Sequence, residues 1–304
     1  MVAGPLGKRM NSDPRVSLFR SVPAVLGEGA VWHATRQSLF WLDILGRKIF
    51  EASLDDRETR TRDVEQLIGA IVPTARGDLL AMLQDGIHRL DLGTGRTTPF
   101  VCPAEHDPTQ VRFNDAKCDP QGRLWAGTMA LDESAGRGAL YRITPEGNVR
   151  RMRDQVSISN GLAWSLDQRT LYYIDSPTRA VQAFDFEIET GELSRPRVAI
   201  DFSSQPGFPD GCTIDEEGNL WIAHWGGARV TRWDPVRAQL LDTVEIPVGQ
   251  VTTCTFGGPR LDTLFITTAA CQLSDAEKRE QLHAGSVFAA KVGTRGMPAD
   301  IFAG

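Results

Sequence analysis

Short apolar segments recur along the chain in six similar units. Each unit opens on a polar residue or a glycine, continues as a short apolar strand, turns, and resumes as a second strand of apolar and aromatic residues. For example, Asn160-Gly-Leu-Ala-Trp164 is followed by a polar turn and by Leu171-Tyr-Tyr-Ile-Asp175. Apolar runs of this length bounded by turn signals predict pairs of β-strands. The six units open at Glu28, Gly69, Asn114, Asn160, Asp210 and Thr252.

The spacing of these units predicts the fold. A repeat of roughly 40 to 50 residues with several short strands per unit is typical of propeller blades. Further alternating segments, such as Ala180–Phe186 and Arg229–Asp234, supply the outer strands of the units. We therefore predict an all-β protein, a six-bladed β-propeller, with no helix of convincing length.

A ring of blades must close, because an open ring leaves exposed strand edges. Arg15–Phe19 precedes the first unit and Ser286–Val292 follows the sixth. The simplest prediction is that the N-terminal segment supplies the outer strand of the last blade. Residues 15–304 then form a single propeller domain, and residues 1–14 form a poorly ordered N-terminal extension.

Composition and charge narrow the class of partner. The 304 residues carry a formal net charge of −6 and form no run of Lys or Arg, which argues against nucleic acid and anionic membranes. No apolar stretch approaches the roughly 18 residues that span a bilayer, and the N-terminus lacks the apolar core of a signal peptide. Five scattered cysteines without a CxxC pair indicate reduced thiols. We expect a cytoplasmic protein; oligomeric state cannot be derived.

The opening residues of the units should lie together at one mouth of the central channel. One interpretation is that Asn and Asp at these positions only shape turns. The other is a cation site, because two carboxylates aimed at one point repel each other unless a cation lies between them. Glu28, Asn160 and Asp210 offer the oxygen ligands that Ca²⁺, Mg²⁺ or Mn²⁺ prefers, and Zn²⁺ or Fe²⁺ would also accept them.

Several motifs resemble those of the senescence-marker-protein/gluconolactonase family, which includes regucalcin and bacterial sugar lactonases. Their number and order make the match specific over about residues 25 to 290. They are Leu26-Gly-Glu-Gly-Ala-Val-Trp32, Arg112-Phe-Asn-Asp-Ala-Lys117, Gly122-Arg-Leu-Trp-Ala-Gly-Thr-Met129, Ile158-Ser-Asn-Gly-Leu-Ala-Trp-Ser165, Tyr173-Ile-Asp-Ser176, Pro209-Asp-Gly211, Gly218-Asn-Leu-Trp221 and Phe256-Gly-Gly258.

The resemblance implies a six-bladed propeller with one catalytic divalent metal ion, held by Glu28, Asn160 and Asp210. It also implies that Arg112 and Asn114 contact a sugar substrate. An acidic residue after the Gly-Thr-Met motif touches the substrate in some members of the family, and Asp132 is the aligned candidate here, with Glu133 beside it. The chain departs from the family at Ala30, where Pro is frequent, and at Ala116, where Gly is common; neither change removes a ligand.

We therefore predict metal-dependent hydrolysis of a sugar (aldono) lactone, in which Asp210 is both metal ligand and general base. No GxSxG motif is present and none of the five His residues opens a unit, so a Ser-His-Asp mechanism is not indicated. One alternative is a calcium-binding regulatory protein without turnover. Another is a hydrolase of non-sugar lactones or phosphotriesters. The identity of the metal and the size of the lactone, pentono- or hexono-, stay open.

Overall fold

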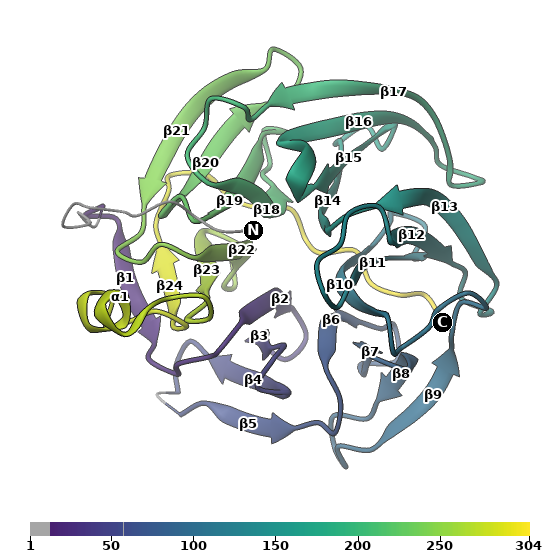
Figure 1. Ribbon diagram of the computed structural model, residues 1–304, viewed down its shortest axis with the longest axis horizontal. Helices are drawn as coiled ribbons and strands as arrows, with labels where there is room; N and C mark the ends of the chain where they lie inside the picture. The colour runs from purple at the N-terminus through teal and green to yellow at the C-terminus, as the bar shows by residue number, and fades with distance from the viewer. Residues whose placement is uncertain (1–12, 57) are drawn as a thin grey trace.

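The computed structural model describes residues 13–56 and 58–304 and shows a ring of six blades around a central axis (Figure 1). Each blade is a four-stranded antiparallel sheet, and neighbouring strands within it follow one another in the chain except in the last blade. The predicted six-bladed β-propeller is confirmed. The two expected unit strands become the first and second strands of each blade.

The first strands of neighbouring blades contact one another around the ring, so they line the channel. They are β2 (Gly27–His33), β6 (Ile68–Pro73), β10 (Val111–Cys118), β14 (Ser159–Trp164), β18 (Phe208–Ile214) and β22 (Val251–Gly257). The second strands are β3 (Ser38–Asp43), β7 (Leu79–Leu83), β11 (Leu124–Ala130), β15 (Thr170–Asp175), β19 (Leu220–Trp225) and β23 (Thr263–Thr268). The residues expected to open each unit therefore lie one to three residues inside the first strand.

The third and fourth strands complete each blade toward the rim. The third strands are β4 (Lys48–Ser53), β8 (Gly86–Leu90), β12 (Gly138–Ile143), β16 (Ala180–Glu187), β20 (Arg229–Asp234) and β24 (Val287–Ala290). The fourth strands are β5 (Arg60–Asp63), β9 (Thr97–Val101), β13 (Val149–Val156), β17 (Glu192–Asp201), β21 (Gln239–Glu245) and β1 (Val16–Arg20).

The ring closes through the sixth blade, where β1 pairs antiparallel with β24 and the strand order is β1-β24-β23-β22. The expectation that the N-terminal segment supplies this outer strand is confirmed. Asp13 accepts hydrogen bonds from the guanidinium of Arg15, which also bonds Asp242 of the fifth blade. The prediction that residues 1–14 are poorly ordered concerns mainly residues 1–12, which lie outside the described residues.

Each interface between neighbouring blades holds its own apolar core, and six such cores run around the ring. Their largest members are aromatic side chains of the second strands, such as Trp41, Trp125 and Trp221, which are fully buried. Trp125 meets Trp164 of the next blade edge to face, with ring centroids 6.0 Å apart. Burial on both faces explains why the second strands are continuous apolar runs rather than alternating ones.

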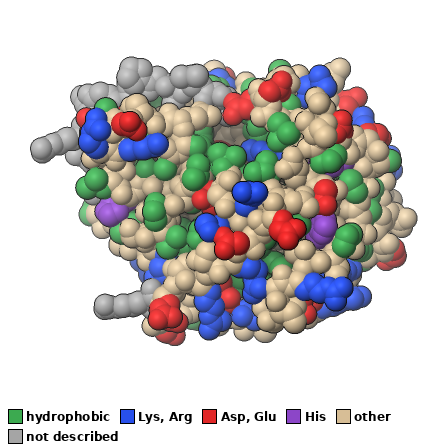
Figure 2. All heavy atoms as spheres, turned by 60° about the horizontal axis from the view of Figure 1, so that its bottom comes forward, with side chains coloured by type: hydrophobic (Ala, Val, Ile, Leu, Met, Phe, Trp, Pro, Cys, Tyr) green, Lys and Arg blue, Asp and Glu red, His purple; other side chains and the backbone are tan. Residues whose placement is uncertain are grey.

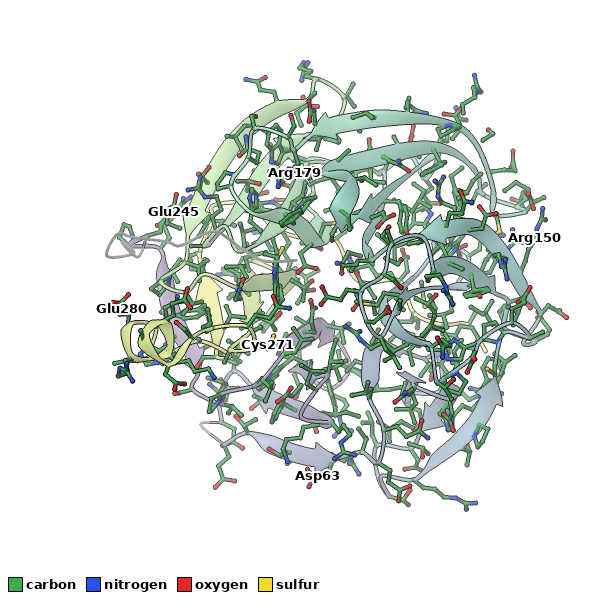
Figure 3. All side chains as sticks on the ribbon, viewed as in Figure 1. Asp63, Arg150, Arg179, Glu245, Cys271 and Glu280 are labelled. Atoms are coloured by element: carbon green, nitrogen blue, oxygen red, sulfur yellow. The ribbon has the colours of Figure 1, made fainter. Side chains whose placement is uncertain are left out.

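The outer strands carry charged side chains that protect the sheet edges from pairing with another chain. Asp63, Arg150 and Glu245 lie at the rim (Figure 3). Across strands, Asp63 pairs with Lys48, and Glu245 pairs with Arg229. Acidic and basic side chains lie intermixed across the face shown in Figure 2.

The chain also has two short helical segments that the strand pattern does not predict. The 3₁₀ helix η1 (Ser176–Thr178) follows β15, and α1 (Asp275–Glu280) precedes β24. Ser274 and Glu277 form a capping box at the start of α1. Of the described helices, neither has the length or apolar character needed to cross a membrane.

After β24 the chain crosses the ring to the second and third blades, where it ends (Figure 1). Phe302 pairs with Thr74 as an isolated parallel bridge and is fully buried in the core between these two blades. Ala303 donates its N–H to the carbonyl of Gly122. The C-terminal segment therefore ties the sixth blade to blades on the other side of the ring.

Candidate functional site

The residues predicted to meet at the channel mouth all lie on first strands, at a shared irregularity. In every blade the register between the first and second strands shifts at this point. Glu28, Asn160 and Asp210 lie at or inside these shifts. A β-bulge redirects a side chain relative to the regular alternation of a strand. Each of the six first strands therefore has an equivalent bulge that can direct side chains toward one end of the channel.

The glycine after each of two predicted ligands is required by close packing and not by a turn. A Cβ on Gly161 would lie 2.8 Å from the carbonyl oxygen of Asp210. A Cβ on Gly211 would lie 2.1 Å from Oγ1 of Thr253 in the next blade. Real Cβ atoms do not approach other atoms so closely, so only glycine lets neighbouring first strands meet here. This explains the Asn-Gly and Asp-Gly pairs without assigning them to turns.

A chain of hydrogen bonds joins the third, fourth and fifth blades at the mouth. Arg112 Nη1 donates to Asn114 Oδ1 at 2.7 Å, and Asn114 Nδ2 donates to Asn160 Oδ1 at 3.0 Å. Asn160 Nδ2 donates to Ser176 Oγ at 2.8 Å, and Ser176 donates to the carbonyl of Pro209 at 2.6 Å. This series of hydrogen bonds ends at Pro209, one residue before Asp210. Arg112, Asn114 and Asn160 are all buried, so the network holds them in fixed orientations.

Three carboxylates crowd the same end of the channel. Burial, followed by the nearby Asp115 carboxylate, raises the pKa of Glu28 to about 8. Burial raises the pKa of Asp210 well above its usual value, and the carboxylates of Glu28 and Asp115 add to the effect. Burial lowers the pKa of Arg112 to about 10, against the opposing pull of Glu28 and Asp210. One buried guanidinium therefore faces more negative charge than it can neutralise.

The polar atoms at this site fit a divalent cation. Asp210 Oδ1 is buried and has no hydrogen-bond partner among the described residues, an arrangement that costs free energy unless another group satisfies the oxygen. In residues 13–56 and 58–304 no three His, Cys, Asp or Glu side chains gather in a metal-binding arrangement. A cation here would therefore take oxygens from two carboxylates, Glu28 and Asp210, and from the Asn160 amide. Hard divalent cations accept such a set.

The loop after β11 places the two acidic candidates differently. Asp132 is exposed, and its carboxylate accepts hydrogen bonds from Ser134 N at 3.0 Å and Ser134 Oγ at 2.6 Å. Glu133 is close enough to Arg112 to favour its charged form. The geometry therefore brings Glu133, and not Asp132, into electrostatic contact with the site. The substrate role of Asp132 stays a prediction.

Further groups at the mouth received no role from the sequence. Asp115 lies inside the Arg-Phe-Asn-Asp motif and adds a third carboxylate, opposed by Lys117. Ser176 ends the Tyr-Ile-Asp-Ser motif and bonds the Asn160 amide. Cys271 lies beside the central opening on the loop after β23, near Arg112 and Glu133 (Figure 3). The first two could have been found from their motifs, whereas nothing in the local sequence marks Cys271.

His224 lies on β19, the second strand of the fifth blade, and is fully buried. Its Nδ1 bonds the carbonyl of Pro206 at 2.9 Å, and its Nε2 bonds Thr231 Oγ1 at 2.6 Å. Burial lowers the pKa of His224 to about 4, so the imidazole is neutral at ordinary pH. Both ring nitrogens form hydrogen bonds to neighbouring protein groups, which gives His224 a structural role.

Comparison with known proteins agrees with the fold. The family model for the SMP-30/gluconolactonase/LRE-like region matches residues 26–270. The chain belongs to this family. A Bacillus subtilis protein named as a candidate sugar lactone lactonase, YvrE, is 37% identical over 92% of this chain and 96% of its own length. Regucalcin of Danio rerio is 37% identical over 90% of this chain and 93% of its own.

Solved structures of the SMP-30/gluconolactonase family share the same propeller. A calcium-binding protein, regucalcin, from Agrobacterium tumefaciens superimposes with a TM-score of 0.89 at 26% identity, over 94% of this chain and 96% of its own. A luciferin-regenerating enzyme superimposes with a TM-score of 0.88 at 33% identity, over 95% and 99%. A gluconolactonase from Xanthomonas campestris, at 23% identity, has a TM-score of 0.76 over 96% and 98% and supports the fold alone.

Proposed function

We propose that this protein hydrolyses a sugar lactone with one divalent cation held by Glu28, Asn160 and Asp210. The observation that carries the proposal is the buried, unpartnered Oδ1 of Asp210 in a site whose carboxylates outnumber its cationic side chains. Membership of the SMP-30/gluconolactonase/LRE-like family and 37% identity to a protein named as a candidate sugar lactone lactonase support the reaction class. Ca²⁺, Mg²⁺, Mn²⁺, Zn²⁺ and Fe²⁺ are the candidate metals.

The chain's own residues divide the work of ester hydrolysis. A bound divalent cation supplies Lewis-acid polarisation of the lactone carbonyl and acidifies water. Asp210 accepts the proton of the attacking water on a carboxylate oxygen and returns it to the leaving ring oxygen as the ester bond breaks. The planar guanidinium of Arg112, fixed by Asn114, orients sugar hydroxyls through directed N–H donors. Glu133, which lies near Arg112, would accept a hydrogen bond from a further sugar hydroxyl.

The polar character of the mouth favours a sugar over the alternatives. An apolar lactone or a phosphotriester has no sugar hydroxyls to pair with the buried guanidinium of Arg112, and a buried donor left without a partner costs free energy. A calcium-binding regulator would use the same oxygen ligands, and a relative at 26% identity is named as a calcium-binding protein. Turnover of a lactone is what separates the two functions.

The direct test is hydrolysis by protein stripped with a chelator and reloaded with each candidate metal. Pentono- and hexonolactones are offered at near-neutral pH, and acid release is followed with spontaneous opening subtracted. We expect activity to vanish on stripping and return with at least one metal. Activity that survives complete stripping would contradict the metal mechanism. Tight metal binding without turnover of any lactone would instead support the regulatory function.

A further inference from the structure

Ser176 lies between two of the proposed ligands and contacts the segments that carry both. It is the first residue of η1 and is fully buried. Its Oγ receives Asn160 Nδ2 at 2.8 Å and reaches the Pro209 carbonyl at 2.6 Å. Its own N–H donates to the carbonyl of Ile158 at 3.2 Å. The hydroxyl therefore links the fourth blade's first strand to the residue before Asp210.

The proton count of this hydroxyl fixes the direction of both hydrogen bonds. A carbonyl oxygen can only accept, so the single proton of Ser176 Oγ goes to Pro209. The oxygen then has only acceptor capacity left, and the atom of Asn160 that faces it must be the NH₂ nitrogen. The amide oxygen of Asn160 consequently points away from Ser176, toward Asn114 Nδ2, which donates to it.

The other side of the Asn160 amide leads to the same orientation. Asn114 Oδ1 accepts from Arg112, which has only donors, so the opposite end of the Asn114 amide is its NH₂ group. That group donates to the Ser159 carbonyl at 2.8 Å and to Asn160 Oδ1 at 3.0 Å. Both series of hydrogen bonds therefore require the same orientation of the Asn160 amide.

We propose that Ser176 is a positioning residue that presents the Asn160 amide oxygen, rather than its NH₂ group, to the cation. The inference rests on the proposed cation site. An amide rotated by half a turn would aim its N–H donors at a positive ion, which repels them. Partners one step removed from a metal typically contribute 10- to 100-fold to its affinity by orienting the ligands.

The test measures the dissociation constant of Mn²⁺ by titration calorimetry on chelator-stripped protein. Ser176→Ala should weaken Mn²⁺ binding by about 10-fold, the lower end of the range for such partners, because the bond from Asn114 still favours the same amide orientation. Ser176→Thr keeps the hydroxyl and should restore most of the affinity. Tyr173→Phe is the matched control, because it removes another buried hydroxyl of the same blade, which donates to Ser159 Oγ at 2.8 Å and touches no proposed ligand side chain. It should leave Mn²⁺ affinity unchanged.

A double-mutant cycle separates orientation from general loosening of the blade. In an Asn160→Asp background either oxygen of the carboxylate can face the cation, so the orienting hydroxyl has nothing to select. Ser176→Ala should then cause no loss of Mn²⁺ affinity. An equal loss in both backgrounds would overturn the inference, as would an equal loss with Tyr173→Phe.

The outcomes also distinguish this inference from the proposed function. Wild-type protein that binds no Mn²⁺, or any other candidate metal, would overturn the cation site and the inference with it. Wild-type protein that binds Mn²⁺ as tightly as Ser176→Ala does would overturn the inference alone and leave the cation site standing.

Discussion

Asp210 and Asp215 are two buried aspartates of the same blade, five residues apart, and their surroundings differ completely. Asp215 follows the end of β18 and is fully buried, yet both of its oxygens are occupied. Oδ1 accepts two backbone N–H groups, and Oδ2 accepts Trp221 Nε1 at 2.9 Å and Arg232 Nε at 2.7 Å. Asp210, at the mouth, keeps one oxygen without a partner among the described residues.

The third blade repeats the satisfied arrangement. Asp119 follows β10 and accepts Trp125 Nε1 at 2.9 Å and Arg123 Nε at 2.6 Å. In both blades the aspartate fixes the hairpin between the first and second strands and the tryptophan in the core. Burial of a carboxylate is therefore no sign of function by itself. An acid that the protein leaves unsatisfied, beside other acids, is the feature that marks the functional end of the channel.

Exchanging Asp210 for Asn should produce the largest effect on chemistry. An amide keeps an oxygen that can bind a cation but cannot accept a proton, so turnover at saturating metal should fall by about 10²- to 10⁴-fold. The free energy of unfolding of the stripped variant should not fall, because the change removes a carboxylate that burial and its neighbours disfavour. Steady-state kinetics and denaturant titration together measure this. Wild-type turnover in the variant would remove Asp210 as the base.

The same exchange at Asp215 should have the opposite signature. Asp215→Asn leaves Arg232 Nε without its buried charge partner and leaves only the exposed Glu217 paired with Nη2, and loss of one member of a buried pair costs about 3 kcal/mol. We expect a lower midpoint of urea unfolding, with Mn²⁺ affinity and kcat of the remaining folded protein retained. A loss of turnover without a loss of stability would break the comparison between the two aspartates.

Per pH unit, the pH dependence of stability should be a smaller effect. Because the pKa of Glu28 is raised from its usual value near 4.5 to about 8, its contribution favours the stripped folded state below pH 4.5 and is lost as pH rises toward 8. The slope is at most about 1.4 kcal/mol per pH unit for one proton. Glu28→Gln should reduce the change in the free energy of unfolding between pH 4.5 and pH 8. Added metal should offset the loss, because it competes with protons for the same oxygens. An unchanged slope in Glu28→Gln would mean that another group titrates.

Much of this architecture follows from the sequence because it is repeated. Six units with a common spacing predict six blades, and the need to close the ring predicts the pairing of Val16–Arg20 with the last blade. The bulges that aim Glu28, Asn160 and Asp210 were not predicted, but their regular recurrence kept these residues at equivalent positions. The site could therefore be proposed before its backbone geometry was known.

The remaining features depend on contacts that no local pattern encodes. Ser176 acquires its role from a 2.6 Å contact with a carbonyl 33 residues away. Asp132 and Glu133 are adjacent acids, and Glu133, whose backbone is left-handed with φ 59°, is the one that lies near Arg112. The C-terminal segment that buries Phe302 between the second and third blades carries no repeat signal. These features depend on contacts between residues far apart in the sequence, so they become visible only in the folded structure.

The most direct measurement of the central claim is anomalous diffraction from crystals of the protein soaked in Mn²⁺. The account predicts one strong peak at the channel mouth, with oxygens of Glu28, Asn160 and Asp210 at about 2.0 to 2.6 Å, the range for divalent cations with oxygen ligands. The Asp210→Asn and Glu28→Gln crystals should each show a weaker peak at the same place, because each variant loses one of the two carboxylate charges. A fully soaked crystal with no peak at the mouth, or with its strong peak elsewhere, would contradict the account.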